Sequence, residues 1–180
     1  LSDVKANNNI NVASIYIGHN SGLYHTNNGS TSNVALGYGT LASTSTGKAN
    51  VAIGRNALTY LNDGNFNTGL GNNALQQLRT GTSNTIVGSG AMLNITTGHN
   101  NTVLGNSAGG DIYSGSDNIL IGNWVTAPSI SGGSASNQLN IGNLIKGNMA
   151  VGSKSVTIDG ALTAAGLIAA STLQAYSKLR

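Results

Sequence analysis

Few side chains in this sequence could catalyse a reaction or bind a metal ion. The chain has no glutamate and no cysteine, so the candidates are its five aspartates and three histidines. They are Asp3, Asp63, Asp111, Asp117, Asp159, His19, His25 and His99. No repeated carboxylate pair suggests a glycosidase, and the histidines lack the near spacing and acidic neighbours of a metal site. We therefore predict no enzyme activity, no metal ion and no cofactor for this segment, although carboxylates of neighbouring chains could still meet.

A second set of residues departs from the small, polar composition of the chain and suits binding. Aromatic rings match the apolar C–H faces of sugars, while asparagine and arginine can bond the surrounding hydroxyl groups. The candidates for contact with a glycan are Arg55, Tyr60, Arg79, His99, Tyr113 and Trp124, and Phe66 departs from the pattern in the same way. The alternative is that each aromatic residue caps an end of the fold or fills an interface between chains.

Composition argues against several other kinds of partner. Charged residues make up only 7% of the chain, and the basic residues behind its formal net charge of +3 are scattered. A nucleic-acid interface needs a clustered basic patch, so we expect none. No apolar run approaches the roughly 20 residues of a membrane-spanning helix. Without cysteine, the chain has neither disulfides nor thiolate ligands.

A repeat of seventeen residues predicts the structural elements that position these residues. Six evenly spaced asparagines mark it, namely Asn33, Asn50, Asn67, Asn84, Asn101 and Asn118. A glycine follows each asparagine after four residues, at Gly37, Gly54, Gly71, Gly88, Gly105 and Gly122. A second glycine precedes each later asparagine by three residues, and an apolar pair such as Ala57-Leu58 lies between the two glycines. Such strict spacing is typical of a repeat protein whose units stack on one another.

We predict that each repeat forms one turn of a parallel β-coil or β-roll, which makes the fold all-β. Seventeen residues cannot hold two helices and a loop, and glycine at fixed positions disfavours a helix interior. Alternating runs such as Val51-Ala52-Ile53 favour strands. Equivalent residues would then stack about 4.8 Å apart. The asparagines would form a ladder of side-chain amides, and the glycines would occupy tight corners with positive φ.

The repeat also predicts association between chains. The repeat at residues 50–66 offers four large side chains for its interior, Val51, Ile53, Leu58 and Leu61. Their burial alone is too small to offset the ordering of seventeen residues, so a single thin coil is expected to be marginal. Exposed strand edges invite further pairing. We therefore predict an obligate homo-oligomer.

The chain divides into four predicted segments. Residues 1–32 form an N-terminal segment with one degenerate turn, and residues 33–126 hold the regular repeats. Residues 127–153 hold a loop and a last capping turn, and residues 154–180 form a thin C-terminal stem of strands. A short helix over residues 162–176 is the alternative for the stem, because alanine and leucine favour helix although Gly166 interrupts them.

The Asn-x-x-Leu-Gly repeats with Gly, Asn and Thr corners resemble the distal shafts of bacteriophage tail fibres and tailspikes. The resemblance covers roughly residues 14–176. In that family, such repeats lie upstream of an intramolecular chaperone domain that trimerises the fibre and then cuts itself off before a serine. Residues 156–177, from Val-Thr-Ile-Asp-Gly to Leu-Gln-Ala-Tyr-Ser, resemble the segment leading into that domain. A chain ending at Arg180 would correspond to the released product.

The resemblance implies a homotrimeric segment of a virion tail fibre, or of a similar injection system, that serves as a shaft and contributes to host attachment. Its partners would be other fibre or baseplate proteins and a host-surface glycan or protein, and a depolymerase could lie elsewhere in the parent protein. Similar turns occur in trimeric autotransporter (YadA-type) adhesin heads on bacterial surfaces, although their usual repeat is shorter. Two further alternatives are a mechanical spacer and an ice-binding solenoid with stacked Thr68, Thr85 and Thr102.

Overall fold

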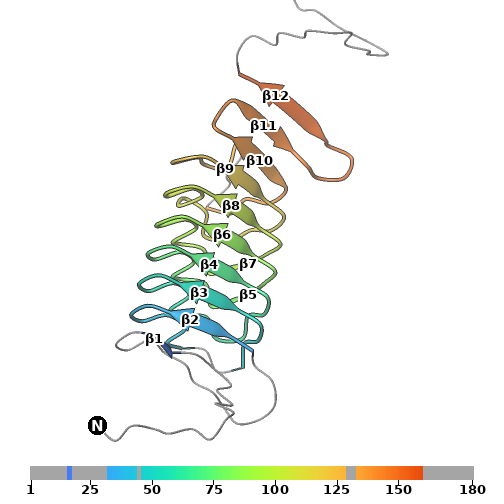
Figure 1. The fold of residues 1–180 in the computed structure, drawn as a ribbon. Helices are drawn as coiled ribbons and strands as arrows, with labels where there is room; N and C mark the ends of the chain where they lie inside the picture. The colour runs from blue at the N-terminus through green and yellow to red at the C-terminus, as the bar shows by residue number, and fades with distance from the viewer. Residues whose placement is uncertain (1–15, 18–31, 44–45, 129–132, 160–180) are drawn as a thin grey trace, which may run out of the picture.

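The computed structural model describes residues 16–17, 32–43, 46–128 and 133–159, which form a parallel β-solenoid. Each turn of the regular part, here called a coil, takes seventeen residues, because Val51 pairs with Thr68 and Thr68 pairs with Thr85. The coils stack one above another in chain order, as Figure 1 shows. The described residues contain no helix. The predicted all-β class and the seventeen-residue parallel coil are therefore confirmed.

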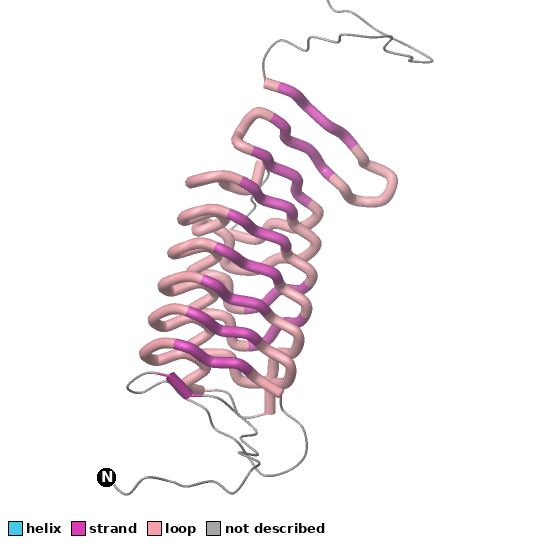
Figure 2. Tube along the Cα trace, in the orientation of Figure 1, coloured by secondary structure: helices cyan, strands magenta, loops and turns pink. Residues whose placement is uncertain are grey.

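Two sheets run along the solenoid. The larger has ten strands in the order β1-β2-β3-β4-β6-β8-β9-β10-β11-β12, and the smaller consists of β5 and β7. The strands are β1 (Tyr16–Ile17), β2 (Val34–Leu36), β3 (Val51–Ile53), β4 (Thr68–Leu70), β5 (Thr80–Thr82), β6 (Thr85–Val87), β7 (Thr97–His99), β8 (Thr102–Leu104), β9 (Ile119–Ile121), β10 (Gln138–Ile141), β11 (Ile145–Asn148) and β12 (Ser155–Ile158). Figure 2 shows that turns and loops make up the rest of each coil.

The buried asparagines determine which strand residues face the interior. Asn50 is fully buried, and side chains along a strand alternate between its two faces. Ala52 therefore also faces the interior and is fully buried, whereas Val51 and Ile53 face outward and are only partly buried. The prediction that Val51 and Ile53 are interior residues is wrong for this reason.

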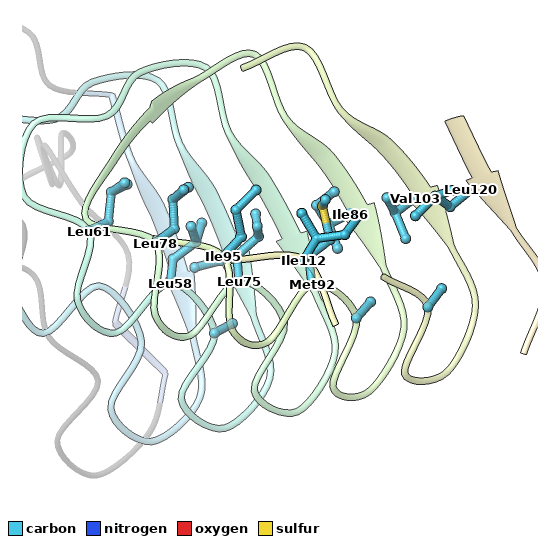
Figure 3. Packing of buried hydrophobic residues seen from close by; sticks show 14 of the residues in the cluster. Leu58, Leu61, Leu75, Leu78, Ile86, Met92, Ile95, Val103, Ile112 and Leu120 are labelled. Carbon is cyan, nitrogen blue, oxygen red and sulfur yellow. The ribbon is translucent and has the colours of Figure 1, made fainter. Parts of the chain in front are cut away.

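Columns of apolar side chains fill the interior. The middle residues of β2, β3, β6, β8 and β9 give one column, the pair after the glycine corner gives a second, and a residue three positions later gives a third. Leu58 and Leu61, which we expected inside, are fully buried. Figure 3 shows Leu61, Leu78 and Ile95 in succession along the solenoid. Because each coil contributes only a few of these side chains, the core exists only where neighbouring coils stack.

Glycine corners allow neighbouring coils to approach closely. Gly54 has a φ of 118°, and a Cβ atom there would lie 2.6 Å from the carbonyl oxygen of Gly71 in the next coil. At the second corner, a Cβ atom on Gly81 would lie 2.5 Å from the carbonyl oxygen of Gly98. All members of the first corner column have positive φ, namely Gly37, Gly54, Gly71, Gly88, Gly105 and Gly122. The stacking distance therefore excludes larger residues from both columns.

The parallel stack ends in an antiparallel hairpin. β10 continues the coil by pairing in parallel with β9, with Leu139 opposite Ile119. β11 then pairs antiparallel with β10, and β12 pairs antiparallel with β11. The side chains of β12 are exposed. The predicted stem beyond residue 159, its helical alternative and the proposed chain end at Arg180 lie outside the described residues.

Candidate functional site

The ladder asparagines hydrogen-bond to one another through the interior. Oδ1 of Asn50 accepts hydrogen bonds from the backbone N–H of Asn67 at 2.9 Å and from its Nδ2 at 3.1 Å. Nδ2 of Asn67 also donates to the carbonyl oxygen of Gly81 at 2.9 Å. The ladder consists of Asn33, Asn50, Asn67, Asn84, Asn101 and Asn118, all at most 7% exposed. Because these amides are buried and bonded to the fold itself, they support the coil and are not accessible to a ligand.

The larger sheet presents two columns of mostly apolar side chains to the outside. One column is Val34, Val51, Thr68, Thr85, Thr102 and Ile119, and the other is Leu36, Ile53, Leu70, Val87, Leu104 and Ile121. We call these residues the outward face. None of them is buried, and Val34, Leu70 and Leu104 are 46%, 40% and 50% exposed. Neither column contains a charged residue, so the outward face is suited to apolar packing.

The smaller sheet presents a different surface. The side chains that flank the buried glycines of β5 and β7 are Thr80, Thr82, Thr97 and His99, and all of them are at least partly exposed. These side chains are polar, so an apolar outer surface is not a general property of the coil. Of the two sheets, only the larger presents an apolar outer surface.

Two of the predicted glycan contacts are arginines that lie over tyrosine rings. The Cζ atom of Arg55 is 5.9 Å from the centroid of the Tyr38 ring, and that of Arg79 is 5.8 Å from the Tyr60 ring. These distances permit cation–π attraction. Tyr38 was not among the predicted contacts, although it precedes Arg55 by seventeen residues and therefore lies in the same column. Because each pair joins neighbouring coils, both pairs have a stabilising role that requires no ligand.

The remaining predicted contacts occupy three different surroundings. His99 lies on β7, and its backbone N–H donates to Oγ of Ser116 at 3.0 Å. Tyr113 is 54% exposed, and Gly133 packs against its ring, because a Cβ atom on Gly133 would lie 3.3 Å from Cε2 of Tyr113. Trp124 is more exposed than Tyr113, at 68%. Of this group, Trp124 lines a hollow.

A hollow of about 410 Å³ lies beside Trp124. Its lining, which we call the Trp124 hollow, consists of Gly90, Leu93, Asn94, Ser107, Gly110, Asp111, Trp124 and Thr126. Oδ1 of Asp111 is buried and has no hydrogen-bond partner among the described residues. Burial raises the pKa of the Asp111 carboxyl, by more than a backbone hydrogen bond lowers it. None of the lining residues belongs to the outward face, so the two surfaces can be altered separately.

The other acidic residues and the histidines form no metal site in the described part of the chain. Asp63 accepts a hydrogen bond from Nδ2 of Asn62 at 2.9 Å, and Asp159 pairs with Nζ of Lys146 at 2.7 Å. Among the described residues, no cluster of three or more such side chains could hold a metal ion. Nor does this part contain a helix long and apolar enough to cross a membrane. Asp3, His19 and His25 lie outside the described residues.

Comparison of the chain with protein-family models, with curated proteins and with solved structures found no match. A functional assignment therefore depends on the outward face and on the Trp124 hollow.

Proposed function

We propose that the chain is a structural segment of a homotrimeric fibre in a phage tail or a similar injection apparatus, and that it contributes to attachment to a host-surface glycan. The outward face is the observation that supports this proposal. It extends along β2, β3, β4, β6, β8 and β9 without a charged side chain. A long apolar surface of this kind favours association, because packing another surface against it removes apolar area from water.

Further copies of the same chain are the partners that fit the outward face best. A second copy carries columns with the same seventeen-residue period, so two parallel chains can match coil to coil along their length. An unrelated partner would have to reproduce that period. Parallel chains also place all coils along one axis, as a fibre requires. The number three rests on the resemblance of the repeats to tail-fibre shafts.

Trimerisation would also support attachment. Each exposed side chain of one chain would occur three times around the fibre axis. Weak contacts with a host surface would then act together, and such avidity can exceed the affinity of a single contact by about 10² to 10⁴ where the geometry allows simultaneous binding. A rigid fibre segment therefore needs only modest affinity at each site.

The test is the mass of the protein in solution, measured by light scattering on the 180-residue chain and on two double variants. Leu70→Asp with Leu104→Asp places two charges on the outward face. Asn72→Asp with Asn106→Asp places the same charges on the same two coils, at exposed positions outside that face. We expect three chain masses for the unaltered protein and for the asparagine variant. The leucine variant is expected to be monomeric or unfolded, because a desolvated charge is costly at an apolar interface.

A milder variant distinguishes a lost interface from a lost fold. Leu70→Ala with Leu104→Ala removes apolar contact area without adding charge. This variant should still assemble, but on dilution it should dissociate at protein concentrations where the unaltered trimer remains intact. A monomeric unaltered chain would contradict the trimer. A leucine-to-aspartate variant that stays trimeric would show that the outward face is not the interface.

A further inference from the structure

The Trp124 hollow lies where the repeat loses side chains. Six residues after the asparagine, the column reads Gly39, Asn56 and Asn73, and the two coils that line the hollow carry Gly90 and Ser107. A second column, nine residues after the asparagine, ends in Gly110, and this residue also lines the hollow. The space therefore lies where residues of both columns carry small side chains or none.

Trp124 has a left-handed backbone conformation. At the equivalent positions of other coils, small or polar residues adopt this conformation. Its φ is 55°, and the equivalent residues Gly39, Asn56, Asn73 and Gly90 have φ values of 70°, 56°, 56° and 66°. Glycine and asparagine tolerate this conformation, but for a bulky side chain it is uncommon and strained. Burial does not offset the strain, because Trp124 is 68% exposed. Phe66 combines a φ of 57° with 64% exposure in the same way, so what sets Trp124 apart is the hollow beside it.

The lining of the hollow combines an aromatic ring with polar groups. Ser107 and Thr126 contribute hydroxyl groups, Asn94 contributes an amide, and Asp111 contributes a carboxylate whose Oδ1 atom lacks a hydrogen-bond partner. Oδ1 itself is closed to solvent, so it is an unpaired buried acceptor that costs stability and not an exposed contact for a ligand. The volume of about 410 Å³ lies within the usual range for small-molecule sites. A second hollow, at the hairpin of β11 and β12, lacks an aromatic wall, since Asn148, Met149, Lys154, Ser155 and Val156 line it.

We infer that the Trp124 hollow is a saccharide-binding site, in which Trp124 stacks on the apolar face of a pyranose ring and Asp111 accepts a hydrogen bond from a ring hydroxyl. Sugars combine an apolar C–H face with hydroxyl donors at the ring edge, and this combination matches the aromatic and polar groups of the lining. The inference rests on the proposed attachment function for its biological role. The site itself can be tested without it.

Fluorescence offers a direct measurement, because Trp124 is the one tryptophan of the chain. The assembled protein would be titrated with soluble neutral hexose, N-acetylhexosamine and deoxyhexose oligosaccharides while tryptophan emission is recorded. We expect a saturable change with at least one of these classes. Calorimetry with the saccharide that binds gives the affinity for variants that lack the fluorophore.

Two substitutions test whether the saccharide binds in the Trp124 hollow. Trp124→Asn installs the residue that the same column carries at Asn56 and Asn73, so we expect it to weaken binding by about tenfold or more while raising the melting temperature. Asp111→Ala should weaken binding by removing the acceptor. Tyr38→Ala, which removes an exposed ring outside the hollow, is the matched control and should leave saccharide affinity unchanged.

Several results would overturn the inference. One is the absence of binding across the panel while light scattering still shows the trimer, and this result would leave the fibre proposal intact. Another is saccharide affinity that Trp124→Asn leaves unchanged, because the site would then lie elsewhere. Saturable binding of choline chloride in place of any saccharide would reassign the hollow to cations. Conversely, saccharide binding by a protein that light scattering shows to be monomeric would contradict the fibre and support the site.

Discussion

Each ladder asparagine makes several buried hydrogen bonds that one substitution would remove together. Nδ2 of Asn84 donates to Oδ1 of Asn67 at 2.8 Å and to the carbonyl oxygen of Gly98 at 2.9 Å. Its Oδ1 accepts hydrogen bonds from the backbone N–H and from Nδ2 of Asn101, at 3.1 Å and 2.9 Å. Alanine would remove all four of these bonds, although Oδ1 of Asn67 would still accept from the backbone N–H of residue 84 and Nδ2 of Asn101 would still donate to the carbonyl oxygen of Gly115.

We predict that Asn84→Ala lowers the free energy of unfolding by several kcal/mol, since each buried polar group without a partner costs about 1–3 kcal/mol. Denaturant unfolding of the assembled protein measures the effect. Asn72→Ala, at an exposed position of the same type, is the control and should change stability little. Equal stability of the two variants would mean that the ladder contributes nothing beyond the backbone bonds.

The raised pKa of the Asp111 carboxyl predicts that the stability of the protein depends on pH. Burial raises the pKa of its carboxyl in the folded protein above the ordinary value near 3.8. The folded state therefore holds its proton more tightly than the unfolded state, and the contribution of this group to stability falls as the pH rises from about 3.8 through the raised pKa. We expect Asp111→Asn to remove this part of the pH dependence of the melting temperature. A variant with an unaltered pH profile would show that Asp111 titrates normally.

At the scale of the element, the corners limit what the sequence can contain. Gly54→Ala would place a Cβ atom 2.6 Å from the carbonyl oxygen of Gly71 and hold alanine at a φ of 118°. We predict a loss of about 2 kcal/mol or more in the free energy of unfolding, measured by denaturant titration. Gly110→Ala is a suitable control, because its nearest neighbour, the carbonyl oxygen of Ser107, would lie 3.4 Å away. Similar losses in both variants would show that close approach of the coils is not the cause.

The strands of the larger sheet also bear on the ice-binding alternative. Thr68, Thr85 and Thr102 align on β4, β6 and β8, but Leu70 and Leu104 flank them on the same outward face. In the proposed trimer this face is covered by other chains. We therefore expect no thermal hysteresis from the assembled protein. Measurable hysteresis would show that the threonines are exposed and that the chains associate in another way.

The sequence predicted the elements better than the direction of their side chains. Spacing alone identified the coil, because an asparagine and a glycine can recur every seventeen residues only if equivalent positions share one environment. The inward side of each strand was misassigned at Val51 and Ile53, because apolar character was taken to mean burial. The burial of Asn50 decides the alternation and turns those two side chains outward. The Trp124 hollow was not predicted, because it results from side chains that Gly90 and Gly110 lack, and a missing side chain does not stand out in a sequence.

At the scale of the whole molecule, the proposed assembly predicts that stability depends on protein concentration. If the outward face is buried only in the trimer, dissociation and unfolding are coupled, and mass action raises the melting temperature as the concentration increases. Scanning calorimetry over a wide concentration range measures this shift. A melting temperature independent of concentration, together with a monomeric mass, would describe a self-sufficient solenoid.

The direction of the bonds between coils has a mechanical consequence. Backbone bonds such as that from Val51 N–H to the carbonyl oxygen of Asn67 join one coil to the next, so they lie along the axis on which the coils stack. A force along that axis acts in series on the contacts between successive coils of one chain. The weakest of these joints between coils therefore opens first. Seventeen freed residues reach roughly 55–60 Å, against about 5 Å while coiled. In the proposed trimer, three parallel chains would share the tension. Each joint that opened would lengthen its chain rather than break the fibre.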